Sequence, residues 1–339
     1  MGVHSKSRVK NKRVPGSSIK RLGIVVNPMS GRDVRRVVAK ASTSTHHEKQ
    51  QQVTRLVLGA LGQGVDEICL ANEPFRINSR AVENLPQKDH VKILDFPLTH
   101  TAADTETMVR YMWEEGCRVF IVLGGDGTNR IVARTFPESI ILPLSTGTNN
   151  VFPSFVEASI AGAAAGLIAS GQVDYRTHCQ RCKQIHIGSE IALIDTVLLN
   201  EKLLGSLLPY ETSNIQSLLL TRAEPASIGV SPIGGYLMPC HQEDDFGVFV
   251  KCGKSGTTIT VPISPGLYND VHVEEIRKVE LSEQITISGP GLLAFDGDRT
   301  IKLKAGESRE LIVKRDGPWI IESNNIMRIA AAEGLFVIG

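Results

Sequence analysis

The first 170 residues alternate between short apolar runs and longer amphipathic stretches. The apolar runs predict strands that are buried on both faces, at residues 21–27, 67–71, 91–96, 119–123 and 139–144. The stretches between them have the apolar spacing of helices. One of these helices opens with a capping box at Thr45 and Glu48, and another is predicted between Thr101 and Gly116. Strands alternating with helices predict an α/β fold with a doubly wound parallel sheet.

A different pattern begins after about residue 171. Helical spacing largely disappears, and short β-forming runs are separated by Gly-Pro, Asp-Gly and Pro-Gly pairs. These runs cover residues 191–199, 215–221, 247–252, 257–261, 284–288, 292–295, 300–303 and 310–314. The chain therefore divides into a tail (residues 1–20), a nucleotide-binding α/β domain (21–171) and a β-rich domain (172–339). We expect the C-terminal segment of the β-rich domain to pack back on the first domain.

The charge pattern argues against several classes of partner. Net charge is +1, and seven of the 37 Lys and Arg residues stand in the first 21 residues, which contain no Asp or Glu. We therefore expect a disordered, solvated tail and no nucleic-acid partner. No apolar run approaches the roughly 18 residues of a membrane helix, and the tail lacks the apolar segment of a secretory signal. A cytoplasmic protein without a membrane partner is predicted, and the sequence leaves open whether it forms a homo-oligomer.

The six cysteines are scattered along the chain. Cys179 and Cys182 have the spacing of a metal-binding pair, and His178 and His186 are near them in the sequence. A single pair of this kind is weak evidence for zinc. Free thiols, with no metal site made by the protein, are the favoured interpretation.

The most informative stretch is Gly124-Gly125-Asp126-Gly127-Thr128, which follows the fourth predicted strand. It precedes a predicted helix at residues 129–136, for which Thr128 is the expected N-cap. Glycines let the backbone approach a bulky anion, and a helix N-terminus offers N–H groups and a positive dipole end to a phosphate. An isolated Asp-Gly pair would more often be an ordinary turn. The complete string predicts a phosphate-binding turn.

Two other predicted strands end in small polar residues. The first is followed by Asn27, Ser30, Gly31 and Arg32, and the fifth by Ser145, Thr146, Gly147, Thr148, Asn149 and Asn150. Because the carboxyl ends of parallel strands meet at one edge of a sheet, we expect all three loops to converge on one crevice between the domains. The chain has neither a G-x-G-x-x-G fingerprint nor a Walker lysine motif, which disfavours a hydride-transfer Rossmann domain and a P-loop nucleotidase.

Three places in the β-rich domain are further candidates. Asn200 and Glu201 end an apolar run, which is either an ordinary strand terminus or part of a site. Residues 231–236 form a polar, glycine-rich turn. Asp296-Gly297 is typical of a type I′ hairpin turn, although Asp296 and Asp298 could also meet a magnesium ion.

Together these motifs resemble the NAD kinase and diacylglycerol kinase superfamily over nearly the whole chain after the tail. Gly124 to Thr128, Asn200-Glu201 and Phe295 to Gly297 match the motifs of NAD kinases. Asn27 to Asp33 and Ser145 to Asn150 are most similar to the acetoin catabolism protein X subfamily. The chain departs from NAD kinases at Gly235 and Tyr236, where the family has Ser and Thr in a run that contacts the dinucleotide.

The resemblance implies an ATP-dependent kinase of NAD or a closely related small-molecule alcohol, with Mg²⁺ carried by the triphosphate. It implies that Asp126 acts on the 2′-hydroxyl of the adenosine ribose, and that Asn200 and Glu201 contact the dinucleotide. From the residues alone, Asp126 is either a base or a group that orients the acceptor hydroxyl. A lipid-type kinase and a nucleotide-binding regulator that has lost turnover are the alternatives. Small-molecule nucleotides are the expected partners.

Overall fold

A computed structural model of the protein describes residues 19–30, 44–146, 150–200, 211–297 and 299–337. Its first sheet has seven strands in the order β3-β2-β1-β4-β5-β17-β6. They are β1 (Arg21–Val26), β2 (Glu67–Ala71), β3 (Val91–Leu94), β4 (Val119–Leu123), β5 (Ile140–Leu144), β6 (Gln180–Arg181) and β17 (Trp319–Ile320). Strands β1 to β5 are parallel, as the apolar runs predicted.

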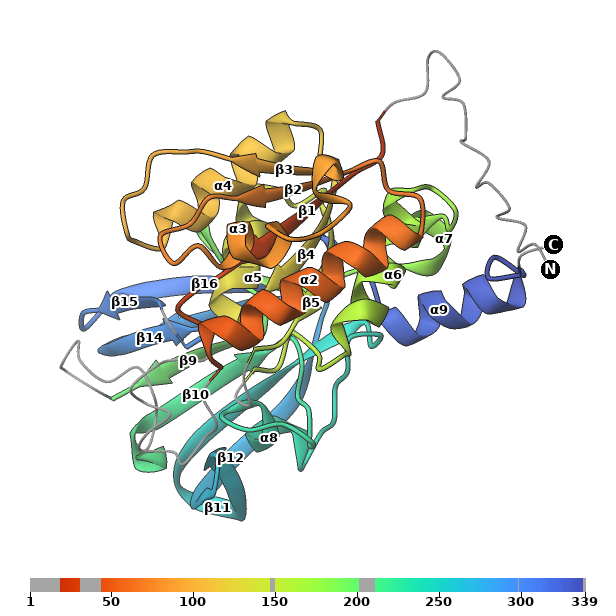
Figure 1. Ribbon diagram of the computed structural model, residues 1–339. Helices are drawn as coiled ribbons and strands as arrows, with labels where there is room; N and C mark the ends of the chain where they lie inside the picture. Colours follow the sequence, from red (N-terminus) through yellow and green to blue (C-terminus); the bar gives the residue numbers. More distant parts are fainter. Residues whose placement is uncertain (1–18, 31–43, 147–149, 201–210, 298, 338–339) are drawn as a thin grey trace, which may run out of the picture.

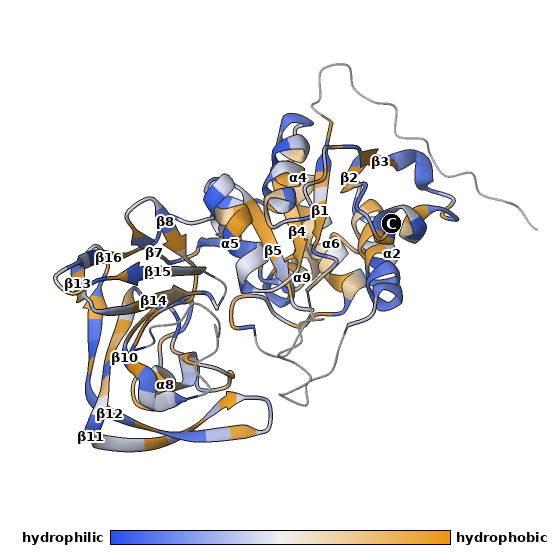
Figure 2. Ribbon diagram, turned by 90° about the vertical axis from the view of Figure 1, so that its left-hand side faces the viewer, coloured by the Kyte–Doolittle hydropathy of each residue, from blue (hydrophilic) through white to orange (hydrophobic). Residues whose placement is uncertain are grey.

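Helices cover both faces of this sheet (Figure 1). One layer contains α2 (His46–Gly62), α6 (Ala158–Ala169) and α9 (Ser323–Ala332), and the other contains α4 (Ala103–Glu114) and α5 (Asp126–Thr135). Neighbouring residues of β1 show the division, because Ile24 packs in the core beneath α2 and Val25 in the core beneath α4. Three short helices complete the domain: α3 (Ile77–Val82), η1 (Lys88–His90) and α7 (Tyr175–His178). The hydrophobic strands in its interior are visible in Figure 2.

The remaining strands form two antiparallel sheets. The six-stranded sheet has the order β12-β11-β10-β9-β14-β15, and the four-stranded sheet has the order β13-β16-β7-β8. Their bounds are β7 (Gln184–Ile187), β8 (Glu190–Ala192), β9 (Asp195–Leu199), β10 (Ile215–Leu220), β11 (Phe246–Ser264), β12 (Leu267–Glu280), β13 (Gln284–Ser288), β14 (Gly291–Phe295), β15 (Arg299–Leu303) and β16 (Ser308–Lys314). The short helices η2 (Thr212–Asn214) and α8 (Ser231–Gly235) lie between strands. A parallel α/β domain and a β-rich domain confirm the predicted fold class.

The end of the chain contributes to the first domain. Strand β17 pairs in parallel with β5, so that Trp319 lies opposite Ile140. Helix α9 follows, and its Ile326 and Ala330 are buried in the core shared with α2 and α6. The chain therefore passes from the first domain to the second and returns.

Several predicted boundaries were wrong, each for a local reason. Helix α5 begins at Asp126 with Gly125 as its N-cap, so Thr128 lies inside the helix rather than capping it. Helix α6 is capped by Glu157, whose carboxylate accepts from two backbone N–H groups, and not by Ser154. Residues 191–199 form two strands instead of one, whereas the runs at 247–252 and 257–261 belong to the single strand β11. Strand β12 was not predicted, because most of its residues are polar and exposed.

Candidate functional site

The three polar loops meet at the carboxyl edge of the first sheet. Asn27 follows β1, and its side-chain amide donates to the hydroxyl of Thr128 at 2.9 Å. The backbone N–H of Gly124, which follows β4, donates to Leu144 O at the end of β5 at 3.2 Å. Asn150 lies against Gly125, where an added Cβ would be 2.8 Å from the Asn150 Oδ1 atom. These contacts confirm that the three loops converge.

The turn into α5 has the features of an anion site. Gly125 caps the helix without any side-chain hydrogen bond to its first turn, so the terminal N–H groups are not covered by a cap. A Cβ at Gly124 would lie 2.7 Å from the Thr128 side chain, which explains why this position needs glycine. Thr146 is 8% exposed, and its hydroxyl oxygen has no hydrogen-bond partner within the described part of the chain. An uncapped helix end beside an unsatisfied buried hydroxyl fits the phosphate groups of a nucleotide.

Asp126 is fixed in direction by the backbone that follows β5. One carboxylate oxygen accepts from the N–H of Val151 at 3.2 Å, and the other accepts from the N–H of Phe152 at 3.0 Å. The residue therefore joins the turn after β4 to the loop after β5. A carboxylate held at both oxygens keeps its orientation, which suits the positioning of another group.

The second domain meets α5 through a buried ion pair. Arg130 of α5 is 2% exposed, and its Nε atom lies 3.5 Å from Asp296 Oδ2. Asp296 also accepts from the backbone N–H groups of Leu193, Ile194 and Asp195, at 2.8, 2.9 and 3.4 Å. Burial raises the pKa of Asp296 to about 7, outweighing the opposing effects of Arg130 and the backbone donors. Asp296 is thus a link between the domains.

The alternative role of Asp296 as a magnesium ligand is not supported by this geometry. Its φ of 47° and the φ of 70° at Gly297 are those of a left-handed hairpin turn between β14 and β15. Both carboxylate oxygens bond to protein groups. The hairpin prediction is confirmed, and Asp298 lies outside the described residues.

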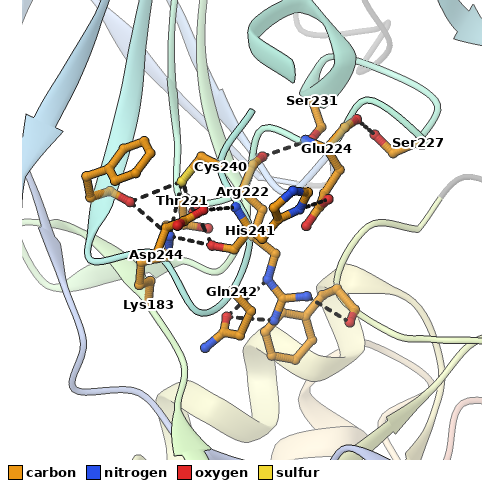
Figure 3. Close-up of polar contacts among 12 residues, drawn as sticks. Lys183, Thr221, Arg222, Glu224, Ser227, Ser231, Cys240, His241, Gln242 and Asp244 are labelled. Carbon is orange, nitrogen blue, oxygen red and sulfur yellow. Dashed lines mark hydrogen bonds and ion pairs between the residues drawn. The ribbon is translucent and has the colours of Figure 1, made fainter. Parts of the chain in front are cut away.

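Arg222 approaches the same region from the end of β10 (Figure 3). Its Nε and Nη2 atoms donate to Gln242 Oε1 at 3.1 and 2.8 Å, and Nη1 donates to Phe152 O at 3.4 Å. The guanidinium also lies 4.7 Å from the centroid of the Phe152 ring. Since Phe152 N–H holds Asp126, Arg222 braces the loop that orients this carboxylate.

Asn200 is not part of this cluster. It follows β9 at the end opposite Asp195, and five residues of strand separate the two by roughly 16 Å. It lines a separate pocket of about 590 Å³ together with Gln216, Lys251 and other residues of the second domain. The glycine-rich run 231–236 forms α8, in which Ser231 is buried and bonds to Arg222 O and Glu224 N (Figure 3).

Some predicted residues cannot be placed, and others were missed. Gly31, Arg32, Gly147, Thr148, Asn149 and Glu201 lie outside the described residues. The sequence analysis missed Lys49, Arg130 and Arg222, all of which are buried near the three loops. Arg130 alone had a signal, because it stands one helical turn after Asp126. Nothing local distinguishes Lys49 or Arg222 from surface cations.

The cysteines give no support for a zinc centre. All six are free thiols, and burial raises the pKa of Cys179 and of Cys182 to about 12. Among the described residues, no three His, Cys, Asp or Glu side chains are grouped to hold a metal ion. A magnesium ion would therefore enter with the triphosphate. In the same part of the chain, no helix is both long and apolar enough to cross a membrane.

Comparison with known proteins places this fold and site in a class. Residues 22–173 match the ATP-NAD kinase N-terminal domain family, and residues 179–316 match the acetoin catabolism protein X C-terminal domain family. The protein therefore has an NAD kinase-like fold, as the motifs had indicated. A solved diacylglycerol kinase structure from Bacillus anthracis str. Sterne is 13% identical, with a TM-score of 0.48, over 90% of this chain and 97% of that one.

A full-length relative defines the family. Acetoin catabolism protein X of Cupriavidus necator is 30% identical over 300 residues, which cover 83% of this chain and 84% of that protein. The chain belongs to the acetoin catabolism protein X family.

Proposed function

We propose that the protein is an ATP-dependent kinase that transfers a phosphoryl group to a hydroxyl of NAD or of a closely related small-molecule alcohol. The observation that carries the proposal is the meeting of three strand-end loops at the uncapped N-terminus of α5. Phosphoryl transfer depends mainly on positioning and on charge stabilisation, with little covalent participation by the protein. This arrangement supplies backbone and side-chain donors for a triphosphate next to a rigidly held carboxylate.

Each group has a role in this proposal. The N–H groups of the first turn of α5 and the Thr146 hydroxyl would bind phosphate oxygens. Mg²⁺, bound with the triphosphate, would neutralise charge on the phosphates. Asp126 would orient the acceptor hydroxyl, since its carboxylate is held at both oxygens by Val151 and Phe152. Arg222 and Gln242 of the second domain would keep that loop in place.

An acceptor other than NAD is the second candidate. In the motif match, Asn200 was expected to contact the dinucleotide, but it lies at the far end of β9 from the residues that face Asp296. The changed residues Gly235 and Tyr236 point in the same direction. A different alcohol, including a lipid headgroup as in the lipid-kinase branch, remains compatible with the donor half of the site.

A transfer assay with labelled ATP tests the proposal. The full chain is incubated with Mg²⁺, ATP and one acceptor at a time: NAD, NADH, short-chain alcohols and a diacylglycerol. Phosphorylation of one acceptor, lost in Asp126→Asn, supports the kinase. Binding of ATP or NAD without transfer to any acceptor would support a regulator, and absence of nucleotide binding would contradict both.

A further inference from the structure

Lys49 is a buried lysine directed at the loop after β1. It lies in the first turn of α2 and is 0% exposed. Its Nζ atom donates to the backbone carbonyls of Asn27, Pro28 and Ser30, at 2.9, 2.8 and 2.6 Å. An ammonium group has three N–H donors, so these three carbonyls match its full donor capacity. One buried side chain thus collects the carbonyls of one loop.

The same loop is tied to the candidate phosphate site. The Asn27 side chain bonds to Thr128 in the first turn of α5, and its Oδ1 atom accepts from the N–H groups of Met29 and Ser30. The loop is therefore fixed on two sides, by Asn27 toward α5 and by Lys49 toward α2. Any shift of its carbonyls would move Asn27 and, through it, the start of α5.

The charge of Lys49 also has an electrostatic consequence. A carbonyl oxygen is the negative end of a peptide dipole, and a carbonyl directed at bound phosphate would repel it. Lys49 holds three such oxygens against its ammonium and places a positive charge behind the loop. In the low dielectric of the interior, this charge is screened much less than one on the surface. The arrangement favours an anion on the side of the loop and of α5.

We propose that Lys49 is a positioning residue for the binding of a polyphosphate at the Asn27 loop and the N-terminus of α5. The inference rests on the proposed function and deepens it, because it assigns the anionic part of the donor to this loop. It predicts that Lys49 contributes to affinity for the phosphates and little to affinity for the nucleoside. A purely structural lysine would affect stability without this selectivity.

The chain contains a matched control in Lys183. This lysine is 1% exposed, and its Nζ atom donates to His241 O and Phe246 O at 2.8 Å each and to Cys240 Sγ at 3.2 Å (Figure 3). It has the same burial and the same number of partners as Lys49, but these partners all lie in the second domain. Lys183→Met therefore reproduces the loss of a buried ammonium away from the three loops.

Titration calorimetry on the full chain tests the proposal, with ATP, inorganic tripolyphosphate and adenosine as probes and the melting temperature as a control. Lys49→Met should weaken ATP and tripolyphosphate binding by about tenfold or more, while adenosine affinity changes by less than about twofold. Lys183→Met should lower the melting temperature but leave all three affinities near those of the parent. Lys49→Arg keeps the charge, but its planar fork cannot reach the same three carbonyls, so we expect a loss of at least about threefold.

Two results would overturn the inference. The first is parent-like tripolyphosphate affinity in a folded Lys49→Met protein, or in Lys49→Arg if the methionine variant does not fold. The second is a parent that binds neither ATP nor tripolyphosphate, which would also remove the proposed function. If the parent binds tripolyphosphate but not ATP, the ATP-dependent kinase fails, and the tripolyphosphate titrations alone decide the role of Lys49.

Discussion

Replacing Asp126 by Asn separates the orienting role of this carboxylate from its structural role. The amide keeps one oxygen, so one of the two N–H groups of Val151 and Phe152 retains its acceptor, while the other faces an NH₂ group. Loss of one charge-assisted hydrogen bond lowers the free energy of unfolding by about 1.5–3 kcal/mol. Domains of this kind have roughly 5–15 kcal/mol of stability, so the variant should remain folded at 25 °C.

Turnover should fall by much more than this structural cost can explain. Removing a group that handles the acceptor proton or hydroxyl costs about 10²–10⁴-fold in kcat. Affinity for ATP should change by less than about threefold, because the backbone of the α5 turn and the Thr146 loop are unchanged. The measurements are kcat and KM in the transfer assay, ATP affinity by calorimetry and unfolding by denaturant.

Asp104 provides the matched control for this substitution. Its two carboxylate oxygens accept from the consecutive N–H groups of Thr99 and His100, at 2.7 and 2.9 Å, in an exposed loop before α4. Asp104→Asn therefore loses the same kind of bond and should keep parent turnover. The reasoning is refuted if folded Asp126→Asn retains kcat within about threefold of the parent, or if Asp104→Asn loses as much activity.

Three further substitutions test other parts of the structure. Gly124→Ala places a Cβ 2.7 Å from Thr128, so denaturant unfolding should show a loss of about 1–3 kcal/mol, whereas Gly62→Ala meets nothing within 4 Å and should not destabilise. Burial raises the pKa of Asp296 to about 7 from about 3.9 in an unfolded chain, so the native state binds the extra proton between these values. Stability should therefore decrease as pH rises from 4 to 7, by at most about 1.4 kcal/mol per pH unit, and Asp296→Asn should flatten this slope; an unchanged slope would contradict the shift. Asn200→Ala should leave kcat unchanged, and a large loss of kcat would show that the far end of β9 takes part in the reaction.

The sequence was sufficient for the first sheet and for the meeting of its loops. Strands β4 and β5 are five-residue apolar runs with every residue buried, which is the pattern of a central parallel strand. Once the strands are parallel, Asn27, Asp126 and Thr146 must follow their carboxyl ends at one edge. The loop contacts therefore follow from a rule of topology and require no knowledge of distant partners.

The buried cations could not be predicted in the same way. Lys49 stands on a helix whose sequence is mostly polar, and its acceptors are 19 to 22 residues earlier in the chain. Asp296 accepts from residues about 102 positions away, which only the folded chain brings together. Such residues have a surface composition and a core position, and no local pattern distinguishes the two.

Asn200 shows why the loop rule did not extend to the second domain. Strand β9 is antiparallel to both of its neighbours, β10 and β14, so the carboxyl ends of this sheet do not share an edge. The amino end of β9 is the end that meets the first domain, because the N–H groups of residues 193–195 hold Asp296, which in turn pairs with Arg130 of α5. Arg222, which follows the neighbouring strand β10, lies at the same end and contacts Phe152. If Asp126 orients the acceptor, the acceptor must lie near these residues, and its recognition should depend on the amino end of β9 rather than on the residue that follows its last position.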